Sequence, residues 1–383
     1  MRYKIGFEFP YFEQKFLLHG HSHFAFSGWV SHMLFVFLTL RMHKPKPVFT
    51  TLIWFNLFTA YGMLISFILQ GYGMISIAFS SLSIIIGYVF GYAFYKSYND
   101  FTDPARPWFL AGLLFNAISS LGTFYLAFMM AKHEIQQHAY LGSIYFYLHF
   151  QYSGWFFFTI MGLLISKLRT VEGFWYNPNM FKVFFLACFP AYFLSILWID
   201  LPWYLFIFPV LSVILQLYGL YLLISFIYHN LKDIRMNWPI LAQVLFTLAF
   251  VALLIKLLLQ AGSVIPEVSK LAFGFRSIVI AYLHLVLLGF TSLFLLGYSV
   301  LFGFIKISFH SKLALYMFSF FVFANEFVLT LQGIASFGYI MIPYLNEILY
   351  FISLSLFLSI TYVLLTIIQI SKGKPLTLLG QRL

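Results

Sequence analysis

The residues best suited to chemistry are histidines at the start of an apolar stretch. His19, His21 and His23 alternate in HGHSHFAFSGWV, and the apolar segment that follows continues to about Leu40. A histidine inside the hydrocarbon of a membrane must be hydrogen-bonded or bound to a metal, because an unsatisfied polar group there is costly. These imidazoles are therefore candidate ligands of a metal or a prosthetic group.

The opening motif recurs twice in weaker form. Its three copies are His23-FAFS-Gly28-Trp29, His149-FQYS-Gly154-Trp155 and His284-LVLL-Gly289-Phe290. A glycine five positions after each histidine removes side-chain bulk, so a flat ligand or a second backbone can approach there. The aromatic residue after the glycine can pack on such a ligand. The alternative interpretation of each copy is a histidine bonded to a neighbouring helix and a glycine that serves helix packing.

Composition determines what kind of element carries these motifs. The chain is 62% hydrophobic and only 9% charged, a balance that predicts a polytopic membrane protein. Its single cysteine, Cys188, excludes disulfide frameworks, iron–sulfur clusters and thiolate zinc sites. The absence of a C-x-x-C-H motif also excludes a covalently attached haem c. The net charge of +11 is scattered over short connections, which indicates membrane topology signals and not nucleic-acid binding.

Apolar runs long enough to cross a membrane predict an all-α transmembrane bundle of about eleven helices, with ten to twelve acceptable. We expect one integral membrane domain over residues 1–383, with an outer interfacial segment at 1–17 and an inner polar tail at 371–383. The least certain boundaries are 198–203 and 333–343, the second being either a re-entrant piece or part of a longer helix. The predicted helices are 18–40, 48–70, 73–95, 107–131, 138–166, 180–198, 202–229, 238–260, 276–305, 313–333 and 345–370.

Basic residues predict the orientation of the bundle. Most of the 22 Lys and Arg lie in connections that face inward if the C-terminus is inside. We therefore expect a multi-pass protein of the cell (inner) membrane, with its N-terminus outside and its C-terminus in the cytoplasm. The three motifs then open the first, fifth and ninth crossings, and all three histidines lie in the outer half of the lipid bilayer.

Two segments resemble a known family. His21-Ser-His23-x4-Gly28-Trp29 resembles the H-x-H-x4-G-W signature of haem–copper oxidase subunit I of the cbb3 type. It also resembles the H-x-H-x4-G-F of the related NnrS-type membrane proteins associated with nitric oxide stress. The stretch FYLHFQYSGWFFFTIMGLL is similar to the helix of that family that carries a copper-binding histidine. In the family, ligand histidines come from helices four apart, so the resemblance implies a pseudo-repeat of four helices.

The resemblance also implies a set of ligands and an activity. His23 and His284 would be the axial ligands of a b-type haem near the outer face, with His21 as a second or alternative ligand. His149 would be a copper ligand. The adjacent His-His pair that completes the copper site in the family is missing, so reduction of oxygen to water is not expected. We expect instead electron transfer, or binding or reduction of a diatomic gas (NO or O2), with a respiratory or electron-donor partner.

Other polar residues offer supporting roles. His19 shares a helical face with His23 and is either a metal ligand or simply solvated. His138 shares a face with His149 and is a second metal ligand or a helix-start residue. Glu326, deep in an apolar helix, is a candidate proton carrier or a protonated acid bonded within the bundle. Tyr145, one turn before His149, is a candidate donor of protons or electrons.

The competing hypothesis is a transporter of copper or a small solute that contains no haem. It is motivated by the outer histidines, by Glu326 and by the interrupted segment at 333–343. Lys256 and Arg276, near the outer ends of their helices, either pair with haem propionates or extend to lipid headgroups.

Overall fold

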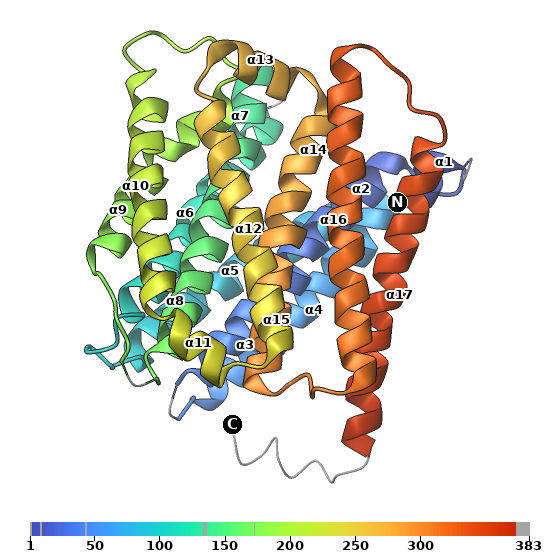
Figure 1. The fold of residues 1–383 in the computed structure, drawn as a ribbon. Helices are drawn as coiled ribbons and strands as arrows, with labels where there is room; N and C mark the ends of the chain where they lie inside the picture. Colours follow the sequence, from blue (N-terminus) through green and yellow to red (C-terminus); the bar gives the residue numbers. More distant parts are fainter. Residues whose placement is uncertain (1, 8–9, 43, 133–135, 172, 373–383) are drawn as a thin grey trace.

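The computed structural model describes residues 2–7, 10–42, 44–132, 136–171 and 173–372 and is all-helical over that part of the chain (Figure 1). Ten of the described helices are long and apolar enough to cross a membrane, and an eleventh is obtained if one bent pair is counted as a span. This confirms the predicted polytopic helical bundle. The ten spans are Gln14–Leu40, Pro47–Gln70, Met74–Ser97, Arg106–Lys132, Gln137–Leu168, Ile207–His229, Ile240–Gly262, Arg276–Phe302, Phe309–Phe337 and Leu345–Ile368.

Three of the spans are composite, and they are the three that carry the histidine motif. We call them motif helices 1, 2 and 3. Motif helix 1 joins α2 (Gln14–His23), η1 (Phe24–Ser31) and α3 (His32–Leu40). Motif helix 2 joins α7 (Gln137–His149), η2 (Phe150–Phe156) and α8 (Phe157–Leu168). Motif helix 3 joins α14 (Arg276–His284), η4 (Leu285–Ser292) and α15 (Leu293–Phe302).

The other helices fill the intervals between the motif helices in chain order. Between motif helices 1 and 2 lie α4 (Pro47–Gln70), α5 (Met74–Ser97) and α6 (Arg106–Lys132). Between motif helices 2 and 3 lie α9 (Asn179–Cys188) with η3 (Pro190–Ile196), α10 (Ile207–His229) and α12 (Ile240–Gly262). In the described part of the chain, α16 (Phe309–Phe337) and α17 (Leu345–Lys372) are the only helices after motif helix 3. The described chain thus has the expected four-helix repeat, with one helix fewer in the last interval.

Motif helix 2 is the most buried span: 89% of its apolar window lies inside the bundle, against 22% for α5 and α17. Large apolar side chains on the outer helices face outward, such as Trp54 of α4 and Phe351 of α17. In water such a surface would aggregate, whereas in a bilayer it faces lipid. Helices α9, α10, α16 and α17 flank the bundle in Figure 1.

The structure places both boundaries that the apolar runs left open. Residues 198–203 lie in a non-helical connection, and α10 begins only at Ile207. The helix α16 runs without a break through Gly333 to Phe337, so 333–337 belong to a longer helix, whereas 338–343 are non-helical. The bent span is instead α9 with η3, where the axis turns by 44° at Pro190. Short helices that the apolar runs did not predict lie in the connections: α1 (Arg2–Gly6), α11 (Leu231–Asn237) and α13 (Pro266–Gly274).

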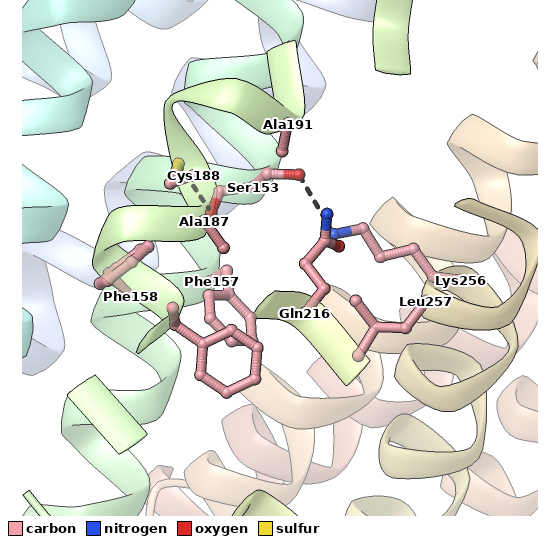
Figure 2. A pocket seen from close by; sticks show the side chains of 10 residues that line it. Ser153, Phe157, Phe158, Ala187, Cys188, Ala191, Gln216, Lys256 and Leu257 are labelled. Carbon is pink, nitrogen blue, oxygen red and sulfur yellow. Dashed lines mark hydrogen bonds between the residues drawn. The ribbon is translucent and has the colours of Figure 1, made fainter. Parts of the chain in front are cut away.

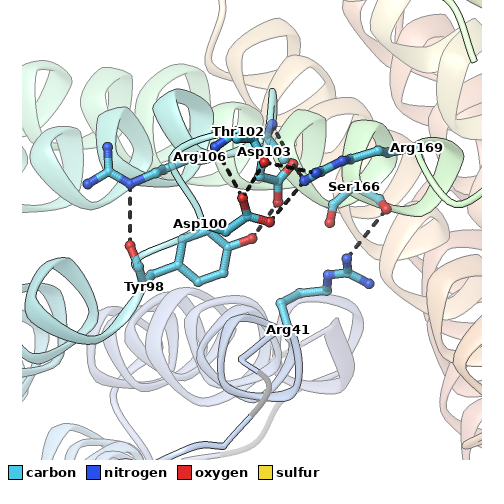
Figure 3. Close-up of polar contacts among 9 residues, drawn as sticks. Arg41, Tyr98, Asp100, Thr102, Asp103, Arg106, Ser166 and Arg169 are labelled. Carbon is cyan, nitrogen blue, oxygen red and sulfur yellow. Dashed lines mark hydrogen bonds and ion pairs between the residues drawn. The ribbon is translucent and has the colours of Figure 1, made fainter.

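One end of the bundle is tied by an ionic cluster (Figure 3). Arg169, just after α8, contacts Asp100 at 3.0 Å and Asp103 at 3.3 Å in the connection between α5 and α6. A hydrogen bond from Thr102 and the charge of Arg169 hold the pKa of Asp100 below its ordinary value. Arg41, at the end of motif helix 1, donates to the Ser166 carbonyl at 3.4 Å. This is the end that the distribution of basic residues predicts to face inward.

Candidate functional site

All three motif helices change their winding directly after the motif histidine. Each histidine is the last α-helical residue, and the next seven or eight residues form a π-helix: η1, η2 and η4. Within the described residues, π-helical geometry occurs only at these three places. Because π-helices are rare and concentrate at functional sites, their recurrence shows that the weak sequence repeat is a structural repeat.

The three motif helices contact one another in a cyclic pattern. The aromatic residue six positions after each histidine meets the residue eight positions after another motif histidine. Trp29 donates to Ser292 at 2.8 Å, and Trp155 donates to Ser31 at 3.0 Å. In the third contact Phe290 lies against Phe157, with ring centroids 6.3 Å apart. The repeats therefore form a pseudo-threefold ring with three seams: the first between motif helices 1 and 2, the second between 2 and 3, and the third between 3 and 1.

A second set of contacts follows the same cycle nearer the outer end. Tyr147, two positions before His149, packs across the first seam on Phe26 with ring centroids 6.0 Å apart. The equivalent Tyr282 packs across the second seam on Tyr152 at 6.1 Å. The residue two positions before the motif histidine thus faces the preceding motif helix in motif helices 2 and 3. In motif helix 1 that residue is His21.

In the first seam, His23 faces α4 and the turn that follows it. Its ring stacks on Phe67 with centroids 4.2 Å apart, and its Nε2 lies 3.4 Å from the Tyr72 hydroxyl. The His19 ring packs edge-on against Tyr72 at 4.6 Å, and its Nε2 is buried without a hydrogen bond. Burial raises the pKa of Tyr72 to about 12. The two histidines that share a helical face therefore share an aromatic environment as well.

In the second seam, His149 is completely buried and faces α9. Its Nε2 is 2.9 Å from the Cys188 carbonyl, and its Nδ1 is 3.4 Å from the Ser195 hydroxyl. The Cys188 carbonyl needs a donor because the helix changes from α to 3₁₀ at Pro190, and the Tyr192 amide bonds to Phe189 instead. Since a carbonyl only accepts, the Nε2 proton of His149 points at it. His149 thus supplies the hydrogen-bond donor that the Cys188 carbonyl lacks at the end of α9.

By the same two rules we infer that His21 and His284 both face the third seam. His21 is eight residues before Trp29, which contacts Ser292 across that seam. His284 is equivalent to His23 and His149, each of which faces the helix that follows its own motif helix, and for motif helix 3 that helix is α16. The His284 Nδ1 lies 2.8 Å from the Ile280 carbonyl. This bond puts the proton on Nδ1 and leaves Nε2 as the basic nitrogen.

Glu326 belongs to the same neighbourhood. Gly333 of α16 packs so closely on Ile278 of motif helix 3 that a Cβ would come within 2.9 Å of its side chain. Glu326 is seven residues before Gly333, about two turns along the same face of α16. It is buried, and its carboxylate accepts a hydrogen bond from the Asn325 amide at 3.1 Å. The acid therefore lies on the side of α16 that faces motif helix 3, at about the depth of His284.

The motif glycines serve helix packing. A Cβ on Gly154 would come within 2.5 Å of Phe115 in α6, and one on Gly28 would lie 3.2 Å from Ala60 in α4. A Cβ on Gly289 would lie 3.1 Å from Ala252 in α12. The sequence allowed each glycine to make room for a flat ligand or for a second helix. At all three positions the structure shows the close approach of a second helix.

A polar cavity, which sequence patterns did not predict, lies in the first seam. Asn56 donates to the Ser27 carbonyl at 3.2 Å. Gln151 donates to the Asn116 and Ser119 oxygens, each at 2.8 Å. Ser27, Asn56, Asn116, Ser119 and Gln151 all line this cavity. No single one of these residues stands out in the sequence, because the cluster is assembled from four helices.

The remaining candidates lie away from the motif histidines. The ring of His138, at the exposed start of α7, packs edge-on against Trp198 with centroids 5.6 Å apart. This agrees with its interpretation as a helix-start residue. The Tyr145 ring packs on Trp198 and Phe273. Over the part of the chain that the structure describes, no three His, Cys, Asp or Glu side chains group closely enough to hold a metal ion. The copper roles suggested for His149, His19 and His138 stay predictions.

Comparisons with protein-family models, with curated proteins and with solved structures find no match to this chain. The motif residues and their cyclic arrangement are therefore the basis for a functional proposal.

Proposed function

We propose that this membrane protein binds a b-type haem between His21 and His284 and acts in electron transfer near the outer face of the cell membrane. The observation that carries the proposal is the cyclic contact pattern of the motif helices. From it we infer that His23, with His19 beside it, faces the first seam and that His149 faces the second, whereas His21 and His284, from two different motif helices, face the third. The proposed axial pair uses His21, the alternative ligand that the resemblance allowed, in place of His23.

The donor set fits a haem. Two imidazoles are a common axial pair for haem iron, and no thiolate or carboxylate is needed. The Nδ1–H bond of His284 to a backbone carbonyl is the orientation typical of a metal-bound histidine. His21 is exposed, as expected where the described chain has only α16 and α17 to cover a seam. His23 and His149 lie in the other two seams, where they contact Tyr72 and Cys188.

The haem would supply one-electron redox chemistry, and the chain would supply its setting. Two histidines fill both axial positions of the iron, which favours electron transfer over binding of NO or O2. Asn325 and Glu326 form a buried polar pair on α16, the helix that packs on motif helix 3 through Gly333 and Ile278. We infer that Glu326 takes up or releases the proton that compensates a change of charge in this seam.

The test is the visible spectrum of the purified protein and of three matched variants. We expect a haem spectrum that sharpens on dithionite reduction, and a pyridine haemochrome of the b type. His21→Ala and His284→Ala should each lose the haem, whereas His23→Ala, two positions from His21, should retain it. Colourless protein from a haem-sufficient host would reject the proposal. Loss of haem in His23→Ala with retention in His21→Ala would move the site to the first seam.

The polar cavity of the first seam favours one alternative, a transporter of a small polar solute. Its amides and hydroxyls come from Asn56, Asn116, Gln151 and several serines. Uptake of a small neutral solute or of copper into liposomes, without pigment and abolished by Gln151→Leu, would support this alternative. Pigmented protein without such flux would exclude it.

A further inference from the structure

Lys256 is a cation in the interior of the bundle. It lies in α12, six residues before the end of that span, and its side chain is only 5% exposed. Its Nζ points inward to the Ser153 hydroxyl of η2 at 3.1 Å (Figure 2). The side chain therefore does not extend to the headgroups, as a lysine near a membrane surface usually does.

Among the residues that the structure describes, no carboxylate forms an ion pair with Lys256. In the described part of the chain the ion pairs are those of Arg169, at the other end of the bundle. Around Lys256 the neighbours are Ser153, the Cys188 thiol, the Gln216 amide and the Tyr152 ring, whose centroid is 6.0 Å from Nζ. His149 in the same seam directs its Nε2 proton at a carbonyl and supplies no negative charge. A buried charge without a partner is costly, so a counter-ion or a neutral amine is required.

A small cavity adjoins the ammonium group. Ser153, Cys188, Gln216 and Lys256 contribute its polar wall, and Phe157, Phe158, Phe184 and Leu257 are among its apolar lining. In Figure 2 the side chains of Lys256 and Gln216 converge on the Ser153 hydroxyl. The space accommodates about one particle of the size of a water molecule. This is room for a monatomic anion but not for phosphate or sulfate.

We propose that Lys256, Ser153 and Gln216 form a binding site for one small inorganic anion of halide size. The ammonium supplies the charge, and the Ser153 hydroxyl supplies a neutral hydrogen-bond donor. The Gln216 amide nitrogen donates one hydrogen to the Ser212 hydroxyl at 2.7 Å, and its second hydrogen is the donor for the anion. Excluding water strengthens the attraction between Lys256 and the anion. The site lies in the second seam, away from His21 and His284, and does not depend on the proposed haem.

The experiment is equilibrium binding of radioactive chloride to the purified full-length protein in detergent, with gluconate keeping the ionic strength constant. Chloride and bromide are chosen because they are weak ligands of haem iron. We expect saturable binding of about one chloride per chain, displaced by bromide but not by sulfate. Lys256→Met, which preserves length and apolar packing, should weaken binding about tenfold or more, the change that follows from loss of a charged donor. Lys270→Met, at an exposed lysine of α13, should bind like the wild type.

The opposite results overturn the proposal. Wild-type protein without saturable chloride or bromide binding would mean that Lys256 is held as a neutral amine. Unchanged binding in a folded Lys256→Met would mean that the anion binds elsewhere. If Lys256→Met does not fold, Ser153→Ala, which removes one donor and keeps the lysine, should still weaken binding, and unchanged binding there would equally reject the site.

Discussion

At the scale of single residues, a substitution of His149 distinguishes a structural role of this histidine from a metal-binding role. Its ring satisfies the Cys188 carbonyl that the break in α9 leaves without an amide donor. We predict that His149→Ala lowers the free energy of unfolding by about 1 to 3 kcal/mol, because that carbonyl becomes a buried unpaired acceptor. Thermal unfolding in detergent measures the loss. Unchanged stability together with loss of bound copper would instead support the copper role suggested by the family resemblance.

Sequence reasoning identified the chemically important histidines but not the directions in which they point. His21 and His23 are two residues apart, so they face nearly opposite sides of a helix, and the sequence alone could not say which one faces motif helix 3. The direction of the Lys256 side chain could not be predicted for the same reason. Its distance from the helix end allows both a headgroup contact and the inward hydrogen bond to Ser153. Side-chain direction depends on helix rotation, which is set by packing between helices distant in sequence.

At the scale of helices, two of the motif glycines, Gly154 and Gly289, make a graded prediction. A Cβ on Gly154 would lie 2.5 Å from the Phe115 Cβ, which cannot move without its backbone. A Cβ on Gly289 would lie 3.1 Å from Ala252, a contact that a small shift relieves. We predict that Gly154→Ala destabilises the protein by about 1 to 3 kcal/mol through overpacking. Gly289→Ala should be nearly neutral, because alanine also favours helix formation over glycine.

Thermal unfolding of both variants under identical conditions tests this ranking. Equal and large losses would indicate that both positions need glycine for the π-helical backbone itself and not for the neighbouring helix. Equal and negligible losses would contradict the close packing of α6 on motif helix 2.

The helix boundaries were predictable because long apolar runs end at connections that contain polar residues, glycine or proline. The helices predicted at 48–70 and 107–131 correspond to Pro47–Gln70 and Arg106–Lys132 in the structure. The π-helices were not predictable, because their extra residue per turn leaves no compositional mark in an apolar sequence. Only the threefold recurrence of the His-x4-Gly-aromatic pattern pointed to those places.

At the scale of the whole molecule, the pseudo-threefold ring connects the helix count to the proposed site. The first and second intervals contain three helices each, counting α9 with η3 as one, whereas only α16 and α17 follow motif helix 3 in the described chain. The seam with the fewest covering helices is also the seam to which we assign imidazoles from two different motif helices. The better covered seams contain side-chain networks around Gln151 and Lys256.

The orientation of the bundle is the last prediction, since it decides which side of the membrane supplies electrons to the proposed haem. The distribution of basic residues predicts that the end with Arg169 faces the cytoplasm, so Thr170 should lie inside and Gln136 outside. Cys188 is buried, which makes the chain suitable for labelling of introduced thiols. We predict that in intact cells Gln136→Cys reacts with a membrane-impermeant maleimide, whereas Thr170→Cys reacts only after the membrane is opened. The reverse pattern would place His21 and His284 in the inner half of the bilayer and would require an electron donor in the cytoplasm.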